Sequence, residues 1–118
     1  MTELENIREW EGKYVIDPDE QQIGRLEDVY FDAESDHPLY VTVHTGLLGR
    51  HLTFVPTEGA SLGQGYLKVA RVKAEVSQAP NIELGGDLSA EEEARLFQYY
   101  GIAYAPSSTA AGRRLIRH

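Results

Sequence analysis

Residues 23–56 read IGRLEDVYFDAESDHPLYVTVHTGLLGRHLTFVP and contain three segments with the composition of β-strands. These segments, residues 23–32, 39–45 and 51–55, are rich in β-branched, aromatic and aliphatic side chains. The sequence SDHP at residues 35–38 separates the first two, because Ser and Asp favour turns and Pro cannot donate to a strand ladder. The stretch therefore predicts three strands joined by two turns.

The hairpin formed by the second and third strands has an apolar pattern that favours one register. With a tight turn at residues 46–49, which begin and end with glycine, Val43 lies opposite Leu52 and Val41 lies opposite Phe54. These four side chains then share one face, and the more polar positions share the other. A slip of one residue would mix the two faces. The pattern therefore predicts this pairing, with the apolar face turned toward the core.

The same register places His44 and His51 opposite one another on the face away from the core. Cβ atoms of such cross-strand neighbours lie about 5 Å apart, so the two imidazoles could share a metal ion. A catalytic zinc needs a third protein ligand and a fixed second shell, and the sequence indicates neither. The alternative is a surface pair that is neutral near pH 7 and repels when protonated.

The strand before the hairpin does not alternate cleanly. Ile23, Leu26 and Val29 are spaced by three residues, after which Val29 and Phe31 resume a period of two. An extra residue near positions 27–28 would reconcile the two spacings, and such bulges curve the strands of barrels. This strand is therefore predicted to carry a bulge.

The rest of the chain adds shorter elements on both sides of this stretch. We expect strands at residues 13–16 and 66–72, a glycine-rich connection at 57–65 and one helical turn at 73–78. Trp10 is predicted to pack across an open end of the barrel, with ligand stacking as the alternative. The predicted core consists of the inward apolar positions Val15, Ile23, Leu26, Val29, Phe31, Val41, Val43, Leu52, Phe54, Leu67 and Val69.

A helix is predicted to start after Ser89, which forms a capping box with Glu92. Gly101 stands where a helix-ending glycine belongs. The helix is too short to be stable alone, so its apolar stripe should dock on the barrel; the stripe consists of Leu96, Phe97 and Tyr100. The expected organisation is a short helix over residues 1–11, a β domain over 12–80, a helical extension over 81–104 and a flexible, basic-ended tail over 105–118.

Size and composition restrict the classes of protein that fit. At 118 residues, the chain corresponds to one domain with one modest core. It contains no cysteine, which excludes a disulfide scaffold and cysteine-based metal or redox chemistry. No apolar run approaches the length of a membrane span, and a cytoplasmic location is expected. The formal net charge of −8 has the wrong sign for binding nucleic acid through phosphates.

The sequence shows no catalytic constellation. The serines lie in predicted turns, caps and tail, and none stands in a nucleophile-elbow setting. An acidic run could offer carboxylates to a metal ion or to acid–base chemistry, but a solvated acidic rim explains it as well; it consists of Asp28, Asp32, Glu34 and Asp36. We therefore expect a protein without enzymatic activity and without a cofactor.

Two features suggest contact with a partner. Leu47 and Leu48 stand at the hairpin tip, where a solvated turn should be polar. The C-terminal end is basic and apolar on an acidic chain, with Arg113, Arg114, Leu115, Ile116 and Arg117. It is either a frayed tail on the acidic surface or a tethered motif that binds a partner or a second copy of the chain. Homo-oligomerisation therefore stays open.

The ordered set of short motifs resembles the PRC-barrel family, whose name comes from the photosynthetic reaction-centre H subunit. Its first block contains Trp10-x-Gly12-x-x-Val15, Ile23-Gly24-x-Leu26-Glu27-Asp28-Val29-x-x-Asp32, Tyr40-Val41-x-Val43-x-Thr45-Gly46-x-x-Gly49 and Val55-Pro56. A second block, like the tail of bacterial stand-alone members, contains Ala79-Pro80-x-Ile82, Leu88-Ser89 and Leu96-Phe97-x-Tyr99-Tyr100-Gly101-Ile102-x-Tyr104. Together the two blocks cover roughly residues 10–104. The sequence departs from the pattern at Glu20, where many members have glycine.

The resemblance implies a mainly β fold, a small and strongly bent antiparallel β-barrel with short helices at both ends. It also implies a role in protein interaction or assembly, because that is what members share, and it supplies no active site. A similar barrel is the second domain of a ribosome-maturation factor. An RNA- or ribosome-associated function is therefore the alternative, and metal binding through His44 and His51 is a second one.

Overall fold

The structure is a computed structural model that describes residues 10, 12–35, 37–45, 51–83, 88–103 and 115–117. The first four strands are β1 (Tyr14–Ile16), β2 (Gln22–Asp32), β3 (Pro38–Thr45) and β4 (His51–Pro56). The elements that follow are β5 (Ser61–Gly63), β6 (Tyr66–Lys68), α1 (Lys73–Ser77), β7 (Asn81–Glu83), α2 (Ala90–Tyr100) and β8 (Leu115–Arg117). The fold is mainly β, as the sequence predicts. The predicted N-terminal helix lies outside the described residues, apart from Trp10.

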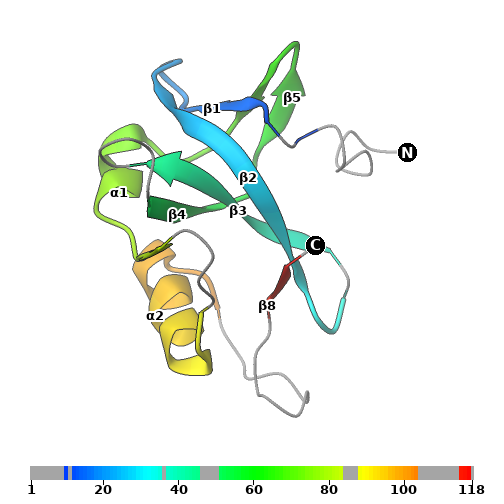
Figure 1. Ribbon diagram of the computed structural model, residues 1–118, viewed down its shortest axis with the longest axis vertical. Coiled ribbons are helices and arrows are strands. Elements are labelled where there is room, and N and C mark those ends of the chain that lie inside the picture. The colour runs from blue at the N-terminus through cyan, green and yellow to red at the C-terminus, as the bar shows by residue number, and fades with distance from the viewer. Residues whose placement is uncertain are drawn as a thin grey trace.

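The strands form one strongly bent sheet in the order β5-β6-β1-β2-β3-β4-β7, and β8 pairs with β2 (Figure 1). The long strand β2 runs through both halves of the sheet. Its register against β3 shifts between Leu26 and Asp28, which confirms the predicted bulge. A second shift between Tyr30 and Phe31 follows. Because bulges bend a strand and increase its twist, these shifts help β2 to curve across the sheet.

The predicted register of the β3–β4 hairpin is wrong by one residue. The structure pairs Val41 with Val55 and Thr42 with Phe54. It pairs His44 with Leu52 and Thr45 with His51, so five residues connect the two strands instead of four. Directly paired residues share a face, and a shift of one residue changes which side chains meet. Phe54 and Leu52 therefore lie on the face opposite to Val41 and Val43.

The register prediction assumed that only one face of the hairpin is buried, and both faces are. The inner face contributes Val41, Val43 and Val55 to a core inside the bent sheet, which also contains Trp10, Val15, Leu26, Val29, Leu67, Val69 and Val76. Ile23 and Phe31, predicted in this core, are only partly buried against it. Trp10 is fully buried, as its predicted packing role requires. A pattern with two apolar faces cannot select a register by burial alone.

The outer face of β2, β3 and β4 forms a second core under α2. It contains the predicted helix stripe and sheet side chains, namely Leu96, Phe97, Tyr100, Tyr30, Tyr40, Leu52, Phe54, Ala79, Leu88 and Leu115. The Tyr100 hydroxyl donates to the backbone carbonyl of Phe54 at 2.6 Å. The predicted capping box of Ser89 and Glu92 is present, and Gly101 ends the helix at φ 70°. The docking of α2 on the barrel is confirmed.

Several short strands lie in segments for which the sequence predicts other structure. Strand β5 lies in the predicted connection 57–65, and β6 ends at Lys68 instead of extending to residue 72. Strand β7 lies at the start of the predicted helical extension and pairs with β4. Strand β8 lies in the segment predicted as a flexible tail and pairs with β2. These strands are three residues long, which is too short for a periodicity signal.

The first turn of the sheet is tied to α1 through a buried carboxylate. Asp17 Oδ1 accepts the backbone N–H groups of Asp19 and Gln21, and Asp17 Oδ2 accepts that of Lys73 at 2.9 Å. The Lys73 bond caps a helix whose N-cap residue, Val72, makes no side-chain cap bond. These bonds, led by the one from Lys73, hold the pKa of Asp17 below its usual value. Asp17 is thus a structural anchor of this turn.

Candidate protein interface

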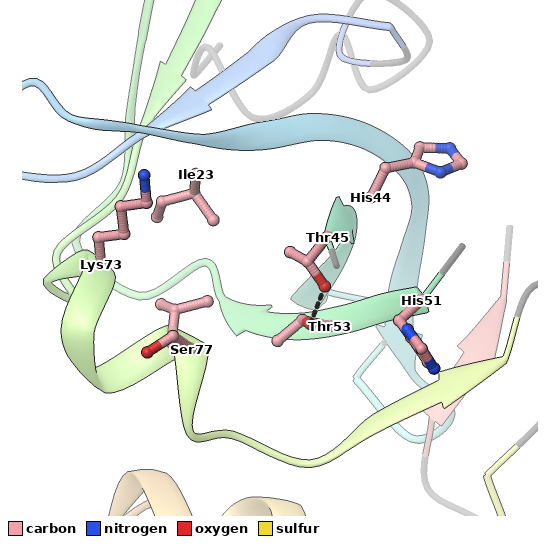
Figure 2. A pocket seen from close by; sticks show the side chains of 8 residues that line it. Ile23, His44, Thr45, His51, Thr53, Lys73 and Ser77 are labelled. Atoms are coloured by element: carbon pink, nitrogen blue, oxygen red, sulfur yellow. Dashed lines mark hydrogen bonds between the residues drawn. The ribbon is translucent and has the colours of Figure 1, made fainter. Parts of the chain in front are cut away.

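The two histidines of the hairpin end point in different directions (Figure 2). The observed register places them opposite other residues and on opposite faces of the sheet, so the predicted cross-strand pair is wrong. His44 Nε2 lies 2.7 Å from Glu27 Oε1, and the two side chains interact on the outer face of the sheet. Within the residues that the structure describes, no group of three or more His, Asp or Glu side chains is placed to hold a metal ion together.

A cavity of about 510 Å³ lies between α1 and the end of the hairpin (Figure 2). Several of its polar groups bond within the protein. The hydroxyls of Thr45 and Thr53 lie 2.5 Å apart across the hairpin, and Ser77 donates to the Ala74 carbonyl at 2.8 Å. The Lys73 side chain brings an ammonium group to the wall. Because these internal bonds occupy hydroxyls that a ligand would use, the cavity is a weaker candidate than the exposed sheet face.

The acidic run does not assemble a site among the described residues. Asp32 is buried and accepts the Glu34 backbone N–H and the Ser35 hydroxyl, both at 3.0 Å, so it organises the β2–β3 turn. The Asp28 backbone N–H bonds to the Thr42 hydroxyl at 3.1 Å across the bulge. Asp36 lies outside the described residues. The two bonds of Asp32 give this carboxylate a structural role in the turn.

The predicted interaction residues divide into two groups. Leu47, Leu48, Arg113 and Arg114 lie outside the described residues. Leu115, Ile116 and Arg117 form β8 on the edge of β2 that faces away from β3. Leu115 is buried in the second core, under α2, and its backbone N–H donates to the buried Glu93 carboxylate at 2.9 Å. In this arrangement Leu115 is part of the fold and is not available as an anchor for a partner.

The outer face of the other half of the sheet, formed by β6, β1 and the start of β2, carries exposed aromatic side chains. Tyr14 in β1 pairs with Tyr66 in β6 on one side and with Arg25 in β2 on the other. Tyr14 and Tyr66 are 38% and 37% exposed, whereas their strand neighbours Val15 and Leu67 are fully buried inside the barrel. In Figure 1 these strands lie at the opposite end of the sheet from α2. This half of the outer surface is therefore not covered by α2.

Two basic side chains accompany the tyrosines. Arg25 Nη2 donates to the Tyr14 hydroxyl at 2.9 Å, and its guanidinium carbon lies 4.7 Å from the centre of the Tyr14 ring. Lys68 lies two residues further along β6, on the same face as Tyr66, where it pairs with the partly exposed Ile16. Tyr14, Ile16, Arg25, Tyr66 and Lys68 together form what we call the aromatic–basic face.

The aromatic–basic face has a different charge from the rest of the molecule. Strands β1, β5 and β6 and the segment of β2 up to Arg25 contain no Asp or Glu, whereas the whole chain has 19 acidic against 11 basic side chains. None of the described residues forms an ion pair with Arg25 or Lys68. The five residues of the face therefore include two cations and no acidic side chain, on a protein that is acidic as a whole.

This surface could not be identified from the sequence because its residues come from distant segments. Tyr14 and Tyr66 are brought together by the parallel pairing of β1 with β6, and no local pattern announces a parallel pair of three-residue strands. The segments themselves do indicate that each tyrosine points outward, although not that the two strands pair. Both read as aromatic–aliphatic alternations, Tyr14-Val15 and Tyr66-Leu67, which place an aromatic residue outward whenever the aliphatic one is buried.

The family model of the PRC-barrel domain matches residues 3–76, which is more than half of the chain. No curated protein with a matching sequence was found. In the part of the chain that the structure describes, no helix is long and apolar enough to cross a membrane.

Proposed function

Because this chain belongs to the PRC-barrel domain family, we propose that it acts as a non-enzymatic, cytoplasmic protein-interaction module, and that the aromatic–basic face is its binding surface. The bent sheet has two outer halves, and α2 covers one of them with a complete apolar core. The other half presents Tyr14 and Tyr66 to solvent. This contrast between a covered and an uncovered half is the observation that carries the proposal.

The residue types on the uncovered half suit a protein interface. Tyrosine and arginine are enriched at the centres of interfaces, where they contribute much of the binding free energy. The Tyr66 ring packs directly against Gly63, where an added Cβ would collide with it. A rigid aromatic side chain loses little conformational entropy on binding.

The same face favours a second candidate function. Tyrosine rings and an arginine could stack on unpaired RNA bases, which would fit an RNA- or ribosome-associated factor. The face contributes only two cations, however, and the net charge of the chain is −8. Since affinity for nucleic acid depends on phosphate neutralisation, a protein partner is the better-supported proposal.

Affinity capture from cell extract with four full-length baits tests the proposal. The baits are the natural chain, Tyr14→Ser, Tyr66→Ser and the control Tyr99→Ser, whose side chain is equally exposed (37%) but lies on α2. We expect the first and last baits to retain the same protein and both face variants to lose it, with and without nuclease. Retention by all four baits would show that the face is not the binding surface. Loss on nuclease treatment would favour the RNA-associated function.

A further inference from the structure

We propose that the aromatic–basic face recognises an acidic segment of a separate protein, in which two carboxylates flank an apolar side chain. This inference rests on the proposed function and adds the chemistry of the partner. Three features support it: the preorganised arginine, the spacing of the two cations and the charge of the remaining surface.

Arg25 is held in an orientation that leaves most of its donors available. Its stacking on Tyr14 and its bond to the Tyr14 hydroxyl fix the plane of the guanidinium group. One N–H is used in that bond, and a guanidinium has five. A planar, fixed guanidinium suits bidentate recognition of a carboxylate, and less entropy is lost per hydrogen bond than with a free side chain. Arg25 is thus the specific anchor for the first carboxylate.

Lys68 provides a second cation at a useful distance. Strand β1 lies between β2 and β6, so two strand spacings of about 4.8 Å each separate the backbones that carry Arg25 and Lys68. Tyr14 and Ile16 in β1 fill the space between the two cations. An extended segment rises about 3.3 Å per residue. Because alternate side chains of an extended segment point to the same side, two carboxylates four residues apart would reach both cations, with the apolar side chain midway between them placed over the β1 residues.

Charge favours an acidic protein segment over a polyanion. An isolated acidic segment meets the positive face without bringing a continuous charge against the acidic remainder of the molecule. A nucleic acid strand carries a phosphate at every nucleotide, and its ends would run past the two cations into the field of an acidic surface. The face is therefore better matched to a short local cluster of carboxylates.

Two synthetic peptides supply the test, because the natural partner is not identified. The first is an octapeptide, blocked at both ends, in which two glutamates four residues apart have a leucine midway between them, and the second replaces both glutamates with glutamine. Each is titrated to a few millimolar into the uniformly ¹⁵N-labelled full chain, followed by amide shifts. We expect shifts at Tyr14, Arg25, Tyr66 and Lys68 with the glutamate peptide. The glutamine peptide should bind at least about five-fold more weakly than the glutamate peptide.

Charge variants identify the groups that recognise the carboxylates. Arg25→Gln and Lys68→Gln should each weaken binding of the glutamate peptide by about two- to five-fold, as expected for partly exposed ion pairs. Arg25→Lys keeps the charge but loses the planar fork, so an intermediate loss is expected. The control Arg95→Gln removes an exposed cation from α2 and should change nothing. An amide spectrum of each free variant verifies that its fold is unchanged.

The possible outcomes separate this inference from the proposed function. Equal binding of both peptides, with shifts on the face, would overturn the carboxylate assignment and leave the interaction function standing. Tighter binding of a ten-residue oligouridine than of the glutamate peptide would identify nucleic acid as the ligand. It would overturn both this inference and the proposed protein-interaction function. If the chain self-associates in sedimentation experiments and Arg25→Gln abolishes the self-association, the face binds a second copy of the chain. That result would overturn the inference of a separate partner protein. Absence of shifts on the face at 5 mM peptide would also overturn the inference.

Discussion

The carboxylate of Glu93 and the backbone N–H of Leu115 form a buried hydrogen bond of 2.9 Å that joins α2 to the C-terminal strand. Glu93 is completely buried, although three consecutive glutamates at the start of α2 would be expected on a solvated face. Burial of a charged group is unfavourable unless it is hydrogen-bonded. The bond to β8 meets part of this requirement, so the C-terminal strand and the helix should depend on one another.

Replacing Glu93 with Ala should lower the free energy of unfolding by about 1–3 kcal/mol, because the Leu115 N–H loses its acceptor inside the protein. Urea denaturation measures the change. Hydrogen exchange of the Leu115 to Arg117 amides should become faster in the same variant. The matched control is Glu91→Ala, since Glu91 starts the same helix with an 89% exposed side chain. Equal stability of the two variants would show that the buried bond does not stabilise the fold.

Glu20 adopts a left-handed backbone conformation, with φ 66°, in the turn between β1 and β2. This conformation is unfavourable for a residue with a Cβ by about 1–2 kcal/mol, and glycine avoids that cost. Since glycine also gains entropy in the unfolded chain, we expect Glu20→Gly to stabilise by only about 0.5–1 kcal/mol. The neighbouring Gln21→Gly, at a position without positive φ, should destabilise. Thermal melts that rank the two substitutions in the reverse order would contradict this account.

Asp17 should make stability depend on acid pH. Its pKa is lowered in the folded state, chiefly by the Lys73 backbone N–H. A pKa that is lower in the folded state than in the unfolded chain stabilises the folded protein. This contribution is complete at pH values above the pKa of the unfolded chain, about 4. It is lost as the pH falls through the pKa of the folded state. We therefore expect the stability gap between the natural chain and Asp17→Asn to be largest above pH 5 and to narrow below pH 4. Urea midpoints from pH 2.5 to 6.5 measure it, and a constant gap would exclude this role.

The parts of the fold that were predictable from sequence depend on local signals. Ser89, Glu92 and Gly101 specify the start and end of α2, and the structure confirms each of them. The bulge in β2 follows from a change of period within one strand. The aromatic–basic face depends instead on the pairing of β1 with β6, whose partners are about 50 residues apart in the chain. Such a juxtaposition has no local signature, so the candidate site was missed while the elements that build it were found.

The hairpin shows why a correct strand prediction can carry a wrong register. Both faces of β3 are buried, since Tyr40 lies under α2 and Val41 lies inside the barrel, each fully buried. The rule that an apolar face turns inward then gives no preference between two registers one residue apart.

The Tyr40 hydroxyl has no hydrogen-bond partner among the described residues. Burial raises its pKa, which indicates a tyrosine placed for packing and kept neutral.

Because the chain has no cysteine, engineered disulfides can test the hairpin register directly. A Phe54→Ala substitution would destabilise in either register, since Phe54 is buried in both, so only a pairing-specific probe decides. Thr45 and His51 are direct partners, and paired Cα atoms lie 4.5–5.5 Å apart, within disulfide range. The double variant Thr45→Cys/His51→Cys should therefore oxidise readily to an intramolecular disulfide. His44→Cys/His51→Cys, which would be directly paired in the alternative register, places its thiols on opposite faces and should stay reduced under the same mild conditions. Thiol titration after gel filtration of the monomer measures both, and preferential oxidation of the second pair would restore the register expected from the apolar pattern.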